Sequence, residues 1–168
     1  HAIVRAAVSG GLPRSRRRPL HLVAARTIEE STWRGPGWEA TAAHHHIAAD
    51  DPAEAAAALD AIVRAAVHAL RNLAYDQAVD LYERAVAAIE RYSLDDARAG
   101  AIHVGLGAAR RRVGDFAAAR DALHVALDLA RSAGQGVVFA EAALELVARG
   151  GRGVDVDLPD AARADLLE

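Results

Sequence analysis

Residues 106–126 read LGAARRRVGDFAAARDALHVA, a stretch in which one glycine–aspartate pair separates two helical patterns. Gly114 is suited to end a helix, because glycine readily adopts the left-handed conformation found there. The side chain of Asp115 can cap the first turn of the helix that follows. From Phe116 to Ala126 the apolar residues recur every three or four positions, the period of a helix with one buried face. The stretch therefore predicts two helices joined by a tight turn.

The second of these helices has a counterpart earlier in the chain. Residues 75–91 (YDQAVDLYERAVAAIER) align with residues 116–132 after a shift of 41 positions, and six apolar positions then coincide. A helical pattern also precedes each copy, over residues 53–72 and 96–113. Residues 135–148 predict the first helix of a third unit. The unit of helix, turn and helix is therefore repeated along the chain.

The composition favours an all-α fold and excludes several kinds of chemistry. The 168 residues include 43 Ala and 20 Arg but no Lys, Cys or Met, and only 4% are aromatic. Alanine is the strongest helix former, whereas β-sheets are rich in aromatic and β-branched residues. Without Cys there is no thiolate nucleophile or Cys-ligated metal. Without Lys there is no phosphate-loop lysine, so we expect this chain neither to bind nor to hydrolyse ATP.

The charge distribution suggests two modules. Residues 1–38 carry a net charge of +5, and the other 130 residues carry −8. We expect helices over about 2–9 and 13–30, a boundary at Trp33–Gly37 where Gly and Pro interrupt the helical pattern, and a repeat domain over 38–148. Residues 149–168 predict a Gly-rich connector and the start of a further helix. A chain that begins with His1 and lacks Met is expected to be part of a longer protein.

The repeat resembles the tetratricopeptide repeat. In that family a Leu-Gly pair in the first helix precedes a Gly-Asp-aromatic turn, and small residues recur in the second helix. The matching positions are Leu106, Gly107, Gly114, Asp115, Phe116, Ala119, Leu123 and Ala126, with Tyr75, Ala78, Tyr82 and Ala85 in the earlier copy. The resemblance implies a right-handed superhelical stack of antiparallel helix pairs, a TPR-like α-solenoid.

A wider resemblance links the chain to large bacterial STAND-type ATPase regulators, the LuxR-type and AfsR-like signal proteins of actinobacteria. Residues 1–30 are similar to the segment that follows their nucleotide-binding domain, and residues 148–158 to the hinge after their third repeat. The matching positions are His1, Ala2, Val4, Arg5, Leu12, Arg17, Leu20, His21 and Ala24, with Ala43, His44 and His45 further on. The resemblance implies that residues 1–36 are the helical remnant of an upstream winged-helix or ATPase-associated module. An ATPase would precede His1, and an output or sensor segment would follow Glu168.

Three clusters of polar residues are candidates for chemistry. His44, His45 and His46, near Asp50 and Asp51, could ligate a metal, but consecutive helical residues point about 100° apart, so we favour one buried and two solvated histidines. The run Arg14, Arg16, Arg17 and Arg18 could face phosphate or form a solvated helix face, although we favour a face that pairs with the absent ATPase domain. Gly150–Gly153, Asp155 and Asp157 are interpreted as part of a solvated connector.

The candidate binding surface follows from the repeat alignment. In a tetratricopeptide stack the first helix of each pair lines the concave groove. The corresponding positions are Asp60, Val63, Val67, Leu70, Arg71, Ala101, Val104, Ala108, Arg111 and Arg112. An apolar floor with Arg at one end suits an amphipathic helix that carries an acidic residue. The alternative is that Val and Leu at these positions only pack against neighbouring helices.

The function most consistent with these features is a non-catalytic protein-interaction and regulatory module of a STAND-type transcriptional or signalling regulator. We expect its partner to be a protein or peptide helix from another segment of the parent regulator. We expect no cofactor, no membrane partner, no direct nucleic-acid binding and a cytoplasmic location. The alternatives are a stand-alone TPR-type peptide-binding scaffold and a metal-dependent enzyme that uses His44–His46.

Overall fold

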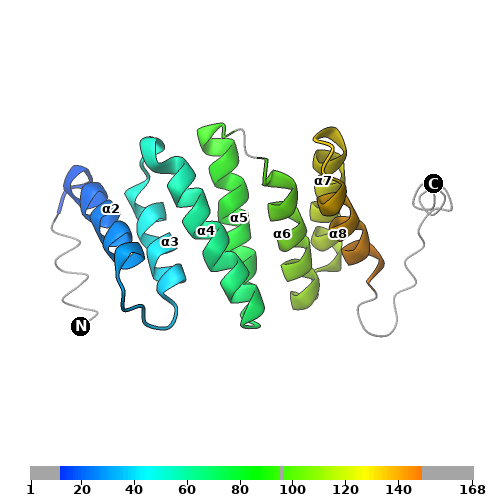
Figure 1. The fold of residues 1–168 in the computed structure, drawn as a ribbon, viewed down its shortest axis with the longest axis horizontal. Coiled ribbons are helices and arrows are strands. Elements are labelled where there is room, and N and C mark those ends of the chain that lie inside the picture. The colour runs from blue at the N-terminus through cyan, green and yellow to red at the C-terminus, as the bar shows by residue number, and fades with distance from the viewer. Residues whose placement is uncertain (1–11, 95–96, 149–168) are drawn as a thin grey trace.

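The computed structural model describes residues 12–94 and 97–148, and this part of the chain is all-α. Its helices form a row in which consecutive helices are antiparallel and lie side by side (Figure 1). They are α2 (Arg14–Glu30), α3 (Trp38–Ala49), the short 3-10 helix η1 (Pro52–Glu54), α4 (Ala55–Arg71), α5 (Tyr75–Tyr92), α6 (Ala99–Val113), α7 (Phe116–Ser132) and α8 (Gly136–Val147).

The helices predicted over residues 13–30 and 53–148 are confirmed, with bounds that differ by a few residues. The predicted turn is also confirmed: Gly114 has a φ of 88°, and the Asp115 carboxylate accepts a hydrogen bond from the backbone N–H of Ala118 at 3.2 Å. One start differs, because the Asp51-Pro52 pair opens a 3-10 turn and the α-helix begins only at Ala55. The predicted helix over 2–9 and the connector over 149–168 lie outside the described residues.

Alanine dominates the core. The main cluster is formed by α3 to α7 and contains Ala65, Ala66, Ala78 and Ala85, each at most 2% exposed. Small side chains allow helix axes to approach closely, so contacts between backbones and short side chains replace those of a core rich in large residues. The largest fully buried side chains are Leu59, Ile102 and Leu123.

Two glycines of α6 allow its close contact with both neighbouring helices. A Cβ atom at Gly105 would overlap the ring of Tyr82 in α5, and one at Gly107 would lie 2.5 Å from Cγ of Leu123 in α7. Tyr82 is 4% exposed and Leu123 1% exposed, so neither has free space to move into. The Leu-Gly pair at Leu106 therefore has a physical role, because a bare Cα is needed where α7 crosses α6.

Helix α2 packs against the helices that follow it. A loop over residues 31–37 separates α2 from α3 and contains the predicted boundary at Trp33–Gly37. Ala25 of α2 is fully buried, and Glu29 contacts His46 of α3 and Arg64 of α4. Leu20 and Val23 of α2 remain exposed, at 56% and 61%, so only part of its apolar surface covers α3.

Candidate functional site

The apolar positions of the predicted groove are largely occupied by packing. Val63, Val67 and Leu70 of α4 are half-buried against the main core cluster. Val104 of α6 packs against a second cluster, and Ala108 is only 5% exposed. For these five positions the structure favours the alternative that we set out from the sequence, in which they pack against neighbouring helices.

The charged positions of the groove connect alternate helices. Asp60 of α4 pairs with Arg98, the residue directly before α6. Arg111 of α6 pairs with Glu145 of α8 and also donates to the carbonyl of Ala148 at 3.3 Å. Arg111 is therefore engaged within the chain, and its contact with a partner stays a prediction.

Three predicted groove positions remain accessible. Arg71 at the end of α4, Ala101 in α6 and Arg112 at the end of α6 are exposed. The Arg112 guanidinium donates to the carbonyl of Ala108 at 2.9 Å and lies 6.0 Å from the centre of the Tyr75 ring. These contacts orient Arg112 and leave its positive charge without an acidic partner among the described residues.

A shallow hollow adjoins Arg112, between the α4–α5 turn and the end of α6. Two of its residues are exposed apolar side chains, Leu73 at 70% and Val113 at 41%. Its lining consists of Leu73, Ala74, Tyr75, Asp76, Gln77, Arg112 and Val113. The repeat alignment compares helix positions only, and it therefore did not identify this hollow, because Leu73 lies in the turn. The φ of Leu73 is 61°, which is unusual for a residue other than glycine and marks this turn as a special feature of the backbone.

The three consecutive histidines have different surroundings. His46 is 3% exposed, His45 is half-buried and His44 is exposed. Nδ1 of His45 lies 2.8 Å from Nδ1 of His21 in α2, and the His44 ring contacts both of these rings. Across residues 12–94 and 97–148, no group of three or more His, Asp or Glu side chains has an arrangement that could hold a metal ion.

Burial and mutual repulsion act on this cluster. Burial lowers the pKa of His21, and the charges of His44 and Arg17 lower it further. Burial also lowers the pKa of His45, with added repulsion from His21, His44 and His46. The short Nδ1–Nδ1 contact requires one nitrogen to donate and the other to accept, so the two rings cannot both be protonated.

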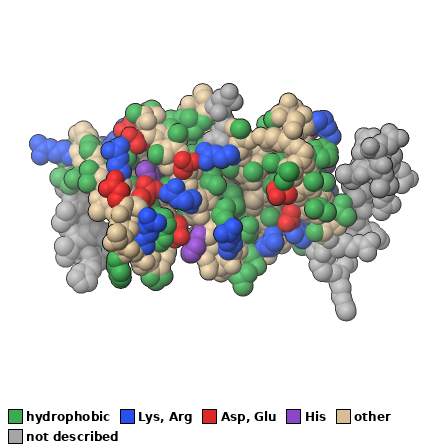
Figure 2. All heavy atoms as spheres, in the orientation of Figure 1, with side chains coloured by type: hydrophobic (Ala, Val, Ile, Leu, Met, Phe, Trp, Pro, Cys, Tyr) green, Lys and Arg blue, Asp and Glu red, His purple; other side chains and the backbone are tan. Residues whose placement is uncertain are grey.

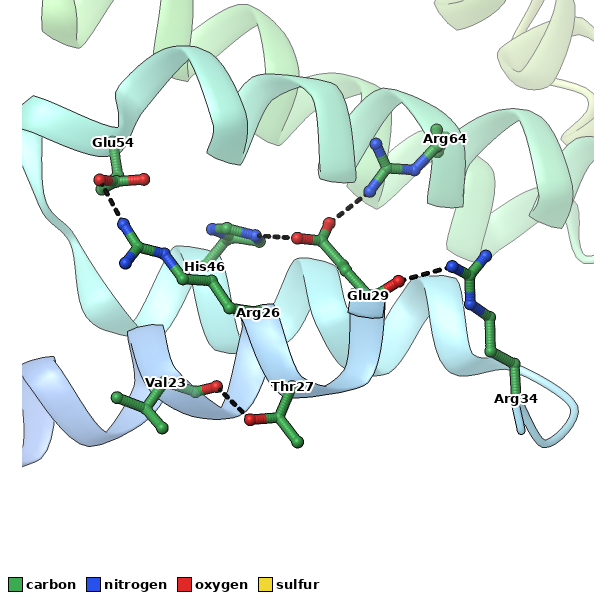
Figure 3. Close-up of polar contacts among 8 residues, drawn as sticks. All are labelled: Val23, Arg26, Thr27, Glu29, Arg34, His46, Glu54 and Arg64. Atoms are coloured by element: carbon green, nitrogen blue, oxygen red, sulfur yellow. Dashed lines mark hydrogen bonds and ion pairs between the residues drawn. The ribbon is translucent and has the colours of Figure 1, made fainter. Parts of the chain in front are cut away.

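Glu29 connects three helices (Figure 3). Its carboxylate lies 3.2 Å from Nε2 of His46 in α3 and pairs with Arg64 of α4, and its backbone carbonyl accepts from Arg34. A second pair, Arg26–Glu54, lies beside it. Basic and acidic side chains lie interspersed over the α2–α5 half of the face in Figure 2. The contacts of Glu29 and Arg26 hold α2 against α3, η1 and α4.

A polar hollow lies between α2, α3 and the end of α5. Asp50, at the end of α3, accepts from the Tyr92 hydroxyl at 2.6 Å and pairs with Arg91 at 2.8 Å and with Arg18. The Tyr92 hydrogen bond and the guanidinium charges hold the pKa of the Asp50 carboxyl below its ordinary value. The hollow is lined by Arg14, Arg17, Arg18, His21, Ile47, Ala48, Asp50 and Arg91. The sequence showed the arginine run but could not show that α3 and α5 close this hollow.

The chain matches no family model, no curated protein and no solved structure. Within the described helices, none combines the length and the apolar character that a membrane crossing requires.

Proposed function

We propose that this chain is a TPR-like protein-interaction module, without catalytic activity, from a STAND-type regulator. The observation that carries this proposal is the pattern of helix contacts. Besides its neighbours in the row, α4 contacts α6, and α6 contacts α8. Contacts between alternate helices are expected where the first helix of each pair lies on one side, so they support a superhelical stack with an inner, concave face.

Ion pairs support the same arrangement. Asp60–Arg98 links α4 to the start of α6, and Arg111–Glu145 links α6 to α8. Both pairs therefore join consecutive first helices. On this proposal they set the spacing along the inner face, and the accessible residues between them meet the partner.

The binding surface that we propose is smaller than the one predicted from the repeat alignment. It consists of Arg71 and Arg112, at the ends of neighbouring first helices, and the hollow with exposed Leu73 and Val113. An apolar hollow beside two cations suits an amphipathic helix with an acidic residue next to its apolar anchor. The proposed partner is such a helix from another segment of the parent regulator.

The test has a genetic and a binding step. The coding sequence upstream of residue 1 is expected to encode a phosphate-loop ATPase, whereas a start codon there would favour the stand-alone scaffold. The other segments of the parent protein are then expressed separately and titrated against residues 1–168. We expect one of them to bind, and the double variant Arg71→Glu and Arg112→Glu to weaken that binding at least about tenfold.

A matched control is Arg120→Glu, which makes the same charge change on an exposed position of α7, the second helix of its pair. This variant should keep its affinity within about twofold, since exposed charges away from an interface contribute little. Equal weakening by both variants would show that only overall charge matters. That result, or the failure of every segment to bind, would overturn the proposed surface.

A further inference from the structure

The polar hollow between α2, α3 and α5 has a large excess of positive charge. Four of its lining residues are arginines, and Asp50 is its one acidic lining residue. The Asp50 carboxylate is fully engaged by the Tyr92 hydroxyl and by two of those arginines, Arg18 and Arg91. The hollow therefore retains a net charge of about +3, counting each guanidinium as +1 and the carboxylate as −1.

Arg14 and Arg17 are the two lining arginines that form no ion pair within the described structure, although the charge of Arg14 helps to lower the pKa of Asp50. They are three positions apart on α2, so their side chains project from the same side of the helix. Nε of Arg17 is buried and has no hydrogen-bond partner among the described atoms. A buried donor without a partner is costly, so this nitrogen would gain from an anion bound in the hollow.

The start of α2 adds to the positive field. The helix begins at Arg14, its first turn contains no acidic residue, and no side chain caps it. The N-terminal end of a helix carries a partial positive charge that favours anions. The guanidinium groups and the helix end therefore favour the same sign of ligand.

We propose that this hollow is a binding site for a phosphate dianion, free or carried by a phosphate monoester, held chiefly by Arg14 and Arg17. A phosphate dianion offers several oxygens to planar guanidinium forks, which match its geometry with paired hydrogen bonds. It also neutralises more of the charge than one carboxylate does. Arg18 and Arg91 remain on Asp50, which fixes the walls of the site while Arg14 and Arg17 close on the ligand.

The site differs from the surface proposed for the partner helix. It is formed by α2, α3 and α5, whereas Arg71 and Arg112 lie at the ends of α4 and α6. Variants of one site leave the other unchanged, so failure of one proposal is distinguishable from failure of the other.

The test is calorimetric titration of the full 168-residue chain at low ionic strength and pH 7.5. The probes are inorganic phosphate, phosphoserine and acetate. We expect saturable binding of inorganic phosphate and of phosphoserine. Acetate should bind at least about tenfold more weakly, because it carries one negative charge where the phosphate group carries about two. Tighter binding of phosphoserine than of inorganic phosphate would identify a phosphorylated molecule as the source, and equal affinity would identify free phosphate. Either result supports the site.

The variant Arg14→Gln with Arg17→Gln should weaken phosphate binding at least about tenfold, since it removes both charge-assisted contacts. Arg16→Gln is the matched control, because Arg16 belongs to the same run and is exposed but does not line the hollow. It should bind within about twofold of the unchanged chain. If the double variant is unfolded by circular dichroism, Arg17→Lys, which keeps the charge but loses the fork, should still weaken binding several-fold.

Three results would overturn the proposal. They are the absence of saturable phosphate binding up to 10 mM, acetate binding as tight as that of phosphate, and equal loss of affinity in the control and double variants. The third result would mean diffuse attraction by the arginine run and no defined site.

Discussion

Leu123 of α7 packs directly onto the bare Cα of Gly107 in α6, so that a Cβ atom there would lie 2.5 Å from its Cγ. Leu123 is 1% exposed and has no space to retreat into. Gly107→Ala should therefore lower the free energy of unfolding by about 1–3 kcal/mol, the usual cost of overpacking, even though alanine is the better helix former. Urea denaturation followed by circular dichroism measures this change.

The matched control for that variant is Gly136→Ala at the start of α8. A Cβ atom at Gly136 meets nothing within 4 Å. The same substitution should therefore leave the chain unchanged or stabilise it by up to about 1 kcal/mol. If both glycine variants have the same stability, the close contact between α6 and α7 is not what Gly107 provides.

Glu29 is the polar partner of a buried histidine. Nε2 of His46 lies 3.2 Å from the Glu29 carboxylate, and Nδ1 of the same ring is buried without a partner among the described atoms. Glu29→Gln removes the charge that also pairs with Arg64. We expect the free energy of unfolding to fall by about 1–3 kcal/mol, as for other part-buried polar groups that lose a charged partner.

The neighbouring variant Glu30→Gln makes the same chemical change at an exposed position. It should alter stability by less than about 0.5 kcal/mol. Thermal melts of the two variants under identical conditions give the comparison. A Glu29 variant as stable as the Glu30 variant would contradict the linking role of Glu29.

The contact between His21 and His45 should make stability depend on pH. The pKa values of both rings lie below their ordinary 6.5 in the folded chain, so the unfolded chain binds protons more readily. The contribution of the two rings to the free energy of unfolding is therefore fully present above about pH 6.5. It is lost as the pH drops through 6.5 toward the lower pKa values of the folded chain. The neighbouring groups that lower the two pKa values are His44, His46 and Arg17, and Asp50 is the acidic residue that lines the same hollow as His21.

Thermal midpoints between pH 7.5 and 5.0 measure this dependence. The double variant His21→Gln and His45→Gln should have a smaller decrease over that range than the unchanged chain. His103, whose pKa is also lowered by burial, acts with the same sign in both proteins and therefore cancels in the comparison. Parallel pH profiles for the two proteins would show that the pair is not responsible.

Removal of residues 1–37 tests whether α2 belongs to the core. If residues 1–37 only served an absent module, this deletion would have little effect on stability. The buried Ala25 and the contacts of Glu29 argue against that, because deletion exposes the α2-facing side of α3. We expect the free energy of unfolding to fall by about 2–4 kcal/mol, which lowers the thermal midpoint by roughly 5–10 °C for a chain of this size. Calorimetry of the shortened chain decides between the two.

The helices could be predicted because their signals are local. Gly114 and Asp115 mark one turn within two residues, and the apolar period from Phe116 to Ala126 lies within a single helix. Such signals depend on backbone preferences and on burial of one face, which the neighbouring residues determine.

The candidate sites could not be predicted in the same way, because they join residues far apart in the chain. Asp50 meets Arg91 and Tyr92 across 41 and 42 positions, and Arg111 meets Glu145 across 34. A charge in the sequence does not indicate which opposite charge it will find. Arg111 was therefore assigned to a partner although Glu145 already neutralises it.

The order of contacts along the row has a consequence for how the molecule comes apart. Each described helix makes its main contacts with the next helix or the next but one. Disruption at one end therefore need not spread at once to the other, and the chain can open in stages. Helix α8, where Ala142 is the one buried residue, should exchange its amide hydrogens long before α4, which buries seven. Local stability therefore differs along the row of helices, and it is lower at α8 than at the centre.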